Sequence, residues 1–201
     1  MIDEWQEVPT LWDAVRFKVD QTTQKGKFIL TGSATPYHKG ILHSGAGRIA
    51  RLRMRTMSLW ESGDSTGEVS LERLCHGELK PVMSGDVSLI KLIELIIRGG
   101  WPGSLGLPEK QAKLLPAEYL NAVIDDDVYR IDGVKRDSHK MHLLLRSLAR
   151  NESTTVTNKT LMKDIRAMED EDIDANTVAA YLDIFKRLFI TENPPPFSSG
   201  I

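Results

Sequence analysis

The order of apolar and polar residues near the amino terminus constrains the fold more than any other feature of this sequence. Ile2 precedes an acidic pair, and a second apolar segment lies at residues 28–30. Between them, apolar residues recur at helical spacing from Leu11 to Val19, and Pro9 stands where a first helical turn would begin. Strand, helix and strand in this order predict a βαβ unit, whose parallel strands place ligands at their carboxyl ends.

Polar side chains follow both predicted strands. Asp3 and Glu4 follow the first, and the second is followed by Thr31, Gly32 and Ser33. Because parallel strands end on the same side of a sheet, we expect these groups to lie side by side. A carboxylate pair there can bind Mg²⁺ and polarise a water molecule, and a hydroxyl can contact a phosphate. The alternatives are an acidic surface turn for the first segment and a simple chain reversal for the second.

Six short segments are characteristic when their order and spacing are taken together. They are residues 2–6, 28–34, 47–52, 57–61, 99–103 and 177–182. This set resembles the AAA-type P-loop ATPases that carry a C-terminal DUF4143 domain. The first four segments resemble the second half of the ATPase domain. The fifth resembles the Gly-Gly-hydrophobic-Pro motif at that family's domain junction, and the sixth resembles its winged-helix segment.

The resemblance implies a role for each polar residue at the predicted strand ends. It implies that Asp3 associates with Mg²⁺, that Glu4 is the catalytic carboxylate, and that Thr31 or Ser33 senses the γ-phosphate of ATP. In AAA-type ATPases an arginine can also reach the γ-phosphate in a neighbouring subunit, and Arg48 is the candidate here. The alternative for Arg48 is a solvated basic face of a strand predicted at residues 48–54.

The sequence departs from this family in lacking the phosphate-binding loop. No G-x-x-x-x-G-K-S/T motif occurs in the 201 residues, and residues 45–48 offer two glycines without the required Lys-Ser/Thr pair. In the family this loop precedes the acidic pair, and the family continues beyond the last predicted helix. We therefore expect an interior fragment that cannot hydrolyse ATP as it stands and binds neither ATP nor Mg²⁺ alone, although an intact parent would bind both.

Charge and composition exclude several classes of protein. A net charge of −2 gives no general electrostatic argument for binding nucleic acid or membranes. The single cysteine, Cys75, excludes a disulfide framework within the chain and fits a reducing cytosol. The first residues do not resemble a signal peptide, and the longest apolar stretch, residues 89–97, contains two charges. These features predict a cytoplasmic protein that does not span a membrane.

Two groups of residues superficially suggest a metal site. His76 follows Cys75, but no further His or Cys stands nearby in the sequence. Residues 125–127 are three consecutive aspartates. Since consecutive helical positions point in different directions, these three cannot all face one ion, and we expect a solvated helix face instead.

Four consecutive regions are expected along the chain. An α/β remnant of a P-loop ATPase domain occupies residues 1–60, a linker occupies 61–85, a helical connector occupies 86–136, and a mainly α, winged-helix-like start of a DUF4143 region occupies 137–201. A helix is expected at 86–98, and its nearly continuous apolar surface predicts burial on more than one side.

Three helices and a strand are expected in the winged-helix-like region. Asp137 and Asn158 are the expected caps of the first two helices, Asn176 begins the third, and Phe189-Ile190 opens a strand. In a winged helix the third helix can enter the DNA major groove. Five carboxylates between residues 169 and 174 would repel phosphates there, which disfavours DNA as the partner.

The leading functional prediction is a partial ATP-binding protein of the AAA/DUF4143 group. The expected partner is a second copy of the chain or another protein. One alternative is a non-enzymatic winged-helix module that binds DNA or protein beside a vestigial ATPase half. A further alternative is a product without an independent function.

Overall fold

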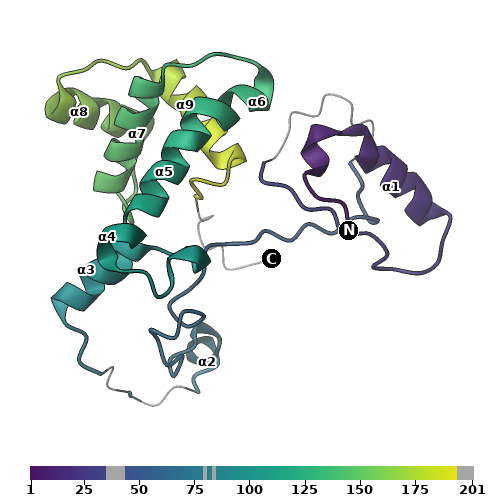
Figure 1. The fold of residues 1–201 in the computed structure, drawn as a ribbon, viewed down its shortest axis with the longest axis horizontal. Coiled ribbons are helices and arrows are strands. Elements are labelled where there is room, and N and C mark those ends of the chain that lie inside the picture. Colours follow the sequence, from purple (N-terminus) through teal and green to yellow (C-terminus); the bar gives the residue numbers. More distant parts are fainter. Residues whose placement is uncertain (35–43, 79–80, 83–84, 194–201) are drawn as a thin grey trace. The chain divides into compact units, whose positions relative to one another are not determined.

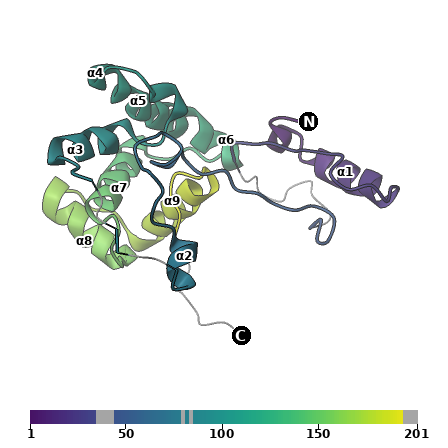
Figure 2. The same cartoon turned by 90° about the horizontal axis from the view of Figure 1, so that it is seen from below.

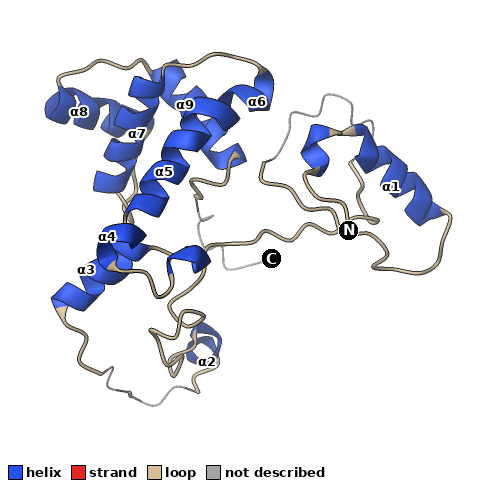
Figure 3. Ribbon diagram, in the orientation of Figure 1, coloured by secondary structure: helices blue, strands red, loops and turns tan. Residues whose placement is uncertain are grey.

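The computed structural model is mainly helical and describes residues 1–34, 44–78, 81–82 and 85–193 (Figure 1). The chain divides into two compact units. The first combines Met1–Arg51 with Ala122–Ile201, and the second is Leu52–Asn121. Across the described ranges the structure contains helices and loops but no β-strand (Figure 3). The last residues of the predicted winged-helix-like region, 194–201, lie outside the described part.

The amino-terminal part of the first unit is a short helix with two extended segments. Helix α1 (Thr10–Asp20) confirms the predicted helix, and it buries Trp12 and Val15. The predicted strand at residues 28–30 is reduced to one parallel bridge between Ile2 and Leu30. A pair of extended segments without further neighbours is marginal as a sheet. The parallel pairing survives, but the expected α/β sheet does not form within the described residues.

The strand predicted at residues 48–54 is also absent. Residues 46–48 form a turn, and the chain then continues without regular structure. The alternation of basic and apolar side chains that suggested a strand therefore has no partner strand to pair with in the described structure.

The carboxy-terminal part of the first unit is a packed set of helices (Figure 2). Its elements are a π-helical turn (Val123–Asp127), α6 (Val128–Asp132), α7 (Ser138–Arg150), α8 (Asn158–Glu169) and α9 (Ala175–Arg187). Helix α7 packs on α8, and α8 packs on α9. The core of this part is closed to solvent and contains Met141, Leu144, Leu161, Ile165, Val178, Ile184 and Phe185.

Side-chain caps begin the three longest of these helices. Asp137 accepts from the backbone N–H of Lys140 at 3.1 Å, which confirms the predicted cap of α7. The cap of α8 lies earlier than expected: Thr157 rather than Asn158 caps it, because an N-cap must stand just outside the helix to accept from its free N–H groups. Helix α9 begins at Ala175, one residue before the expected Asn176, and Asp174 caps it.

The predicted wing strand at Phe189-Ile190 does not form. Phe189 adopts φ +57°, and the backbone N–H of Ile190 turns back to donate to Phe185 O at 2.9 Å. The chain thus closes the end of α9 instead of extending away from it. The three expected helices are present, but the expected wing strand is missing from the residues described.

The second unit, residues 52–121, consists of short helices and loops. It contains α2 (Leu71–Cys75), α3 (Leu89–Arg98), a 3₁₀ turn (Pro102–Ser104), α4 (Glu109–Ala112) and most of α5 (Leu114–Ala122). Among the described residues of this unit, the buried apolar side chains are Leu95 and Ala112.

Helix α3 corrects a prediction about burial. The helix itself is confirmed, with Ser88 as its cap and Gly99 at its end. Its expected burial on more than one side is wrong, because Leu89 and Ile90 are each 71% exposed and Ile96 is 70% exposed. In the described ranges, no helix has both the length and the apolar character needed to cross a bilayer.

Candidate functional site

The two polar segments predicted to meet do lie side by side. The backbone N–H of Thr31 donates to Ile2 O at 2.9 Å, and that of Trp5 donates to Thr31 O at 3.1 Å. Between these bonds, the Thr31 hydroxyl donates to the carboxylate of Asp3. The first acid of the pair is therefore fixed to the hydroxyl that follows the second extended segment.

A second cluster lies slightly further along both segments. The side-chain amide of Gln6 donates to Glu4 Oε2 and, at 3.3 Å, to Ser33 Oγ. Ser33 Oγ in turn donates to the same Glu4 oxygen at 3.3 Å. Glu4, Gln6 and Ser33 thus form a closed polar triangle, whereas Asp3 and Thr31 form a separate pair.

Glu4 has an unusual backbone conformation. Its φ of 49° and ψ of 42° place it in the left-handed region immediately before the 3₁₀ turn Trp5–Glu7. For a residue other than glycine this conformation costs about 1–2 kcal/mol. Strain of this kind persists where surrounding contacts hold it, and it is found often at functional sites. The contacts of Glu4 with Gln6 and Ser33 are of the kind that can hold it.

The residues at this position suit a hard divalent cation. Asp3 and Glu4 supply carboxylate oxygens, and Thr31 and Ser33 supply hydroxyls. Mg²⁺ is commonly held by one or two carboxylates, together with waters and substrate phosphates. In the part of the chain that is described, no group of three or more His, Cys, Asp or Glu side chains could enclose a metal by itself. The donor set therefore fits Mg²⁺ that is shared with a phosphate ligand.

Arg48 is held away from this cluster by its own partner. Its Nε lies 2.8 Å from Asp20 Oδ1 at the end of α1, and its Nη1 donates to Ala46 O at 3.4 Å. The bond from Arg48 lowers the pKa of Asp20 below its usual value. The structure thus does not bring Arg48 to the acidic pair of its own chain, and its role in a neighbouring subunit stays a prediction.

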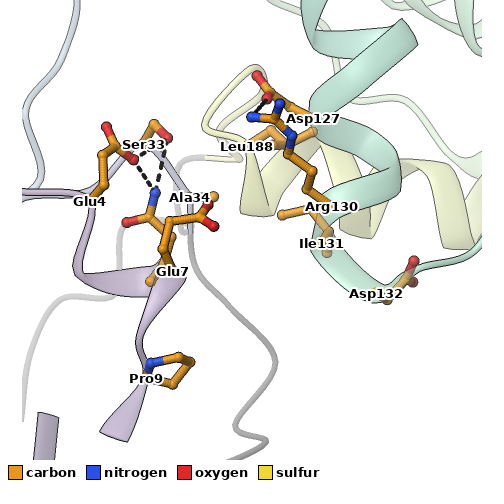
Figure 4. A pocket seen from close by; sticks show the side chains of 11 residues that line it. Glu4, Glu7, Pro9, Ser33, Ala34, Asp127, Arg130, Ile131, Asp132 and Leu188 are labelled. Atoms are coloured by element: carbon orange, nitrogen blue, oxygen red, sulfur yellow. Dashed lines mark hydrogen bonds and ion pairs between the residues drawn. The ribbon is translucent and has the colours of Figure 1, made fainter. Parts of the chain in front are cut away.

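A cavity of about 660 Å³ within the first unit adjoins the Glu4 cluster (Figure 4). Its lining includes Glu4 and Ser33, and also Asp127 and Arg130 from the helical part. Arg130 and Asp127 form an exposed ion pair at 3.7 Å. Asp132 also lines the cavity. The guanidinium of Arg136 lowers the pKa of Asp132, which keeps this carboxylate charged. Carboxylates outnumber cations on this lining, so the cavity favours a ligand that brings a cation.

Sequence reasoning missed three contributors to this region. Gln6 was part of a matching segment but received no role, although its position two residues after Glu4 makes a local contact plausible. Asp127 was placed on a solvated helix face, and Arg130 was not considered. No local signal could have found them, because only the tertiary structure brings them to the same cavity as Glu4.

Comparison with known families divides the chain into two matched parts. Residues 1–62 match the family described as an AAA domain. Residues 89–201, more than half of the chain, match a family described as a domain of unknown function (DUF8612). The region in which the resemblance implied a DUF4143 domain thus matches a different family. Neither a curated protein nor a solved structure matches the chain.

Proposed function

The chain belongs to the DUF8612 family and begins with an AAA-type region, and from this premise we propose that residues 1–34 supply the acidic half of a magnesium–ATP site. The observation that carries the proposal is the direct hydrogen bonding between the two segments, from Thr31 to Asp3 and from Ser33 to Glu4. In P-loop ATPases, phosphoryl transfer depends almost entirely on such positioned charges.

Each side chain has a distinct task in this proposal. Asp3, oriented by Thr31, would hold Mg²⁺, which when bound neutralises charge on the ATP phosphates. Glu4 would orient and polarise a water molecule, since a fixed carboxylate can accept a proton from it. Ser33, which already contacts Glu4, would sense the γ-phosphate. Ser33 lines the cavity beside Glu4 and Thr31 does not, so Ser33 is the stronger candidate of the two predicted sensors.

The proposed site is a partial one. The 201 residues contain no G-x-x-x-x-G-K-S/T motif, so they lack the backbone N–H cradle and the lysine that bind the phosphates of ATP. We therefore propose that this chain contacts a divalent cation weakly and does not hydrolyse ATP by itself. Hydrolysis would need the phosphate cradle to be supplied by another polypeptide segment.

Paramagnetic NMR with Mn²⁺ tests the proposal, because it locates a weakly bound cation residue by residue. Mn²⁺ added to the full chain should broaden the amide signals of Asp3, Glu4, Thr31 and Ser33 first, and ATP should strengthen the effect at Ser33. Asp3→Asn should remove the selective broadening. Glu72→Gln, which removes an exposed carboxylate that does not line the cavity, should leave it unchanged.

Two outcomes would contradict the proposal. Broadening centred on the acidic residues 169–174 instead of the amino-terminal pair would show that the pair is an ordinary surface feature. Mg²⁺-dependent ATP hydrolysis by the purified chain, lost in Asp3→Asn, would show that the site is complete without the missing motif.

For residues 89–201 we propose protein binding rather than DNA binding. The carboxylates before α9 are partly used in the structure: Asp174 caps α9, and Arg166 pairs with Asp172 at 2.7 Å. Because Asp172 is already paired with Arg166, a DNA phosphate could bind Arg166 only by displacing this carboxylate. Titration with duplex DNA at two salt concentrations checks this, and tight binding with a steep salt dependence would overturn it.

A further inference from the structure

We infer that Gln6 is a positioning residue that fixes the Glu4 carboxylate for its task in the proposed site. The inference rests on the proposed function, because it assigns a role within that same site. Gln6 donates to Glu4 on its own segment and to Ser33, which is 27 residues away in sequence. One side-chain amide thus connects the acidic pair to the hydroxyl at the end of the other segment.

The orientation of the Gln6 amide is costly, which argues for a role beyond stability. Its Oε1 is buried and has no hydrogen-bond partner in the described structure. A buried polar atom without a partner is rare in folded proteins and calls for a specific reason. Turning the amide over would place Oε1 against the Glu4 carboxylate, where two acceptors repel. The contact with Glu4 therefore explains why the oxygen is left in the unfavourable position.

Gly32 provides the space for this arrangement. A Cβ atom at residue 32 would lie 2.1 Å from Gln6 Oε1 and 3.3 Å from Trp5 Cδ1. Heavy atoms do not approach to 2.1 Å without a bond, so any larger residue at 32 must displace the Gln6 amide. The position of the Gln6 amide thus depends on the absence of a side chain at residue 32. This steric requirement explains the glycine between Thr31 and Ser33.

The geometry leaves one side of Glu4 for a ligand. Gln6 and Ser33 both donate to Oε2, and the described residues place no donor on Oε1. Two donors on one oxygen fix the rotation of the carboxylate and direct the other oxygen toward what lies beyond the cluster. A carboxylate that is already ordered loses less conformational freedom when it contacts a cation or a water molecule.

A double-mutant cycle in the full chain tests the inference, with the Mn²⁺ dissociation constant from NMR as the readout. Gln6→Ala should weaken binding roughly 3- to 10-fold, the loss expected for about one net hydrogen bond. Gly32→Ala should weaken it similarly by displacing the amide. The double variant should be no weaker than either single variant, because both changes remove the same contact.

A second measurement separates positioning from general stability. NMR relaxation of the Glu4 side-chain methylene groups should show an ordered carboxylate in the native chain, and increased motion in Gln6→Ala. Gln24→Ala, at an exposed glutamine between α1 and the second extended segment, is the control and should change neither quantity. The unfolding midpoint of the helices in residues 123–187 should be the same in all variants.

The outcomes distinguish this inference from the proposed function. If Mn²⁺ does not select the acidic pair in the native chain, the proposed function fails and the inference fails with it. If Mn²⁺ selects the pair but Gln6→Ala binds equally well or more tightly, only the inference is overturned. Strictly additive losses in the double variant would also overturn it.

Discussion

The helices at residues 138–187 and those at residues 89–122 begin in the same way but differ in what they bury. Asp137, Thr157 and Ser88 each cap a helix through a side-chain oxygen. In the first set, the apolar stripes of the helices meet, and Phe185 and Met141 have no exposed surface. In the second, the apolar stripe of α3 faces solvent. Good local signals therefore suffice to start a helix, whereas burial depends on having a second apolar stripe opposite.

The polar side of α3 shows what replaces a core in residues 52–121. Arg98 Nη1 lies 2.6 Å from Asp64 Oδ2 and its Nη2 donates to Ser62 at 3.1 Å, while Lys91 lies 3.5 Å from the other Asp64 oxygen. These polar contacts attach α3 to a loop along the helix face that Lys91 and Arg98 share with the buried Leu95. The unit is thus joined by hydrogen bonds and ion pairs, which contribute less than apolar burial.

Matched truncations of apolar side chains give the largest expected difference between the two regions. Phe185→Ala should lower the free energy of unfolding by about 3–5 kcal/mol, since it opens a cavity in a closed core. Ile93→Ala, at a side chain that is 46% exposed, should cost well under half of that. Chemical denaturation followed by circular dichroism measures both. A loss of several kcal/mol for Ile93→Ala would mean that the apolar stripe of α3 is covered in solution. That result would contradict the difference in burial between the two regions.

A glycine substitution tests whether residues 52–121 have any tightly packed point. A Cβ atom at Gly100 would lie 2.6 Å from Met57 O and 2.8 Å from Thr56 Cβ. Gly100→Ala should therefore displace that segment at a cost of about 1–3 kcal/mol, as overpacking does. Faster amide hydrogen exchange at Met57, whose N–H donates to Gly100 O at 3.0 Å, would report it. Gly103→Ala is the control, because its Cβ meets nothing within 4 Å.

Removing one helix cap from each region sharpens the comparison further. Thr157→Ala and Ser88→Ala each remove an acceptor for a first-turn N–H, worth about 1 kcal/mol. In α8 the loss should appear as lower global stability, because α8 is packed into the core. In α3 it should appear only as faster hydrogen exchange in the first turn. Equal global losses would show that the two helices fold as one cooperative unit.

The smallest expected effect is the pH dependence that Asp64 gives to the attachment of α3. The bonds from Arg98 and Ser62 lower the pKa of Asp64 from 3.8 to about 2. A carboxylate with a lowered pKa stabilises the fold above its unfolded value, and this contribution disappears as the pH falls through about 2. The protection factors of the α3 amides should therefore fall between pH 4 and pH 2. Asp64→Asn should show the lower protection already at pH 5, whereas Asp86→Asn should behave like the native chain.

The sequence predicted the helices well and the sheet poorly. Helices α1, α3 and α7 were found because caps and apolar spacing are local, within one or two turns. The strands at residues 28–30 and 48–54 were not found in the structure as predicted, since a strand exists only when another segment pairs with it. The burial of α3 was wrong for a related reason: a nearly continuous apolar surface indicates that a helix can be buried, not that a partner is present.

The candidate site shows the same division between local and long-range information. The pairing of Asp3 with Thr31 followed from the strand–helix–strand order, and the structure confirms that these residues meet. Their proposed chemical roles stay predictions. Gln6 was missed because its contact to Ser33 depends on the space left by Gly32, which no pattern of apolar and polar residues can reveal.

Two tryptophan rings that contact each other beside the site provide an intrinsic spectroscopic signal. Trp5, which stands between Glu4 and Gln6, lies 5.1 Å from Trp12 of α1, with the rings inclined at 36°. Two indoles at this separation couple their electronic transitions, so their circular dichroism depends on their mutual angle. Any ligand that turns the Glu4–Gln6 segment relative to α1 will change that signal. Binding to the acidic pair can therefore be followed by circular dichroism alone, without dye, tag or isotope.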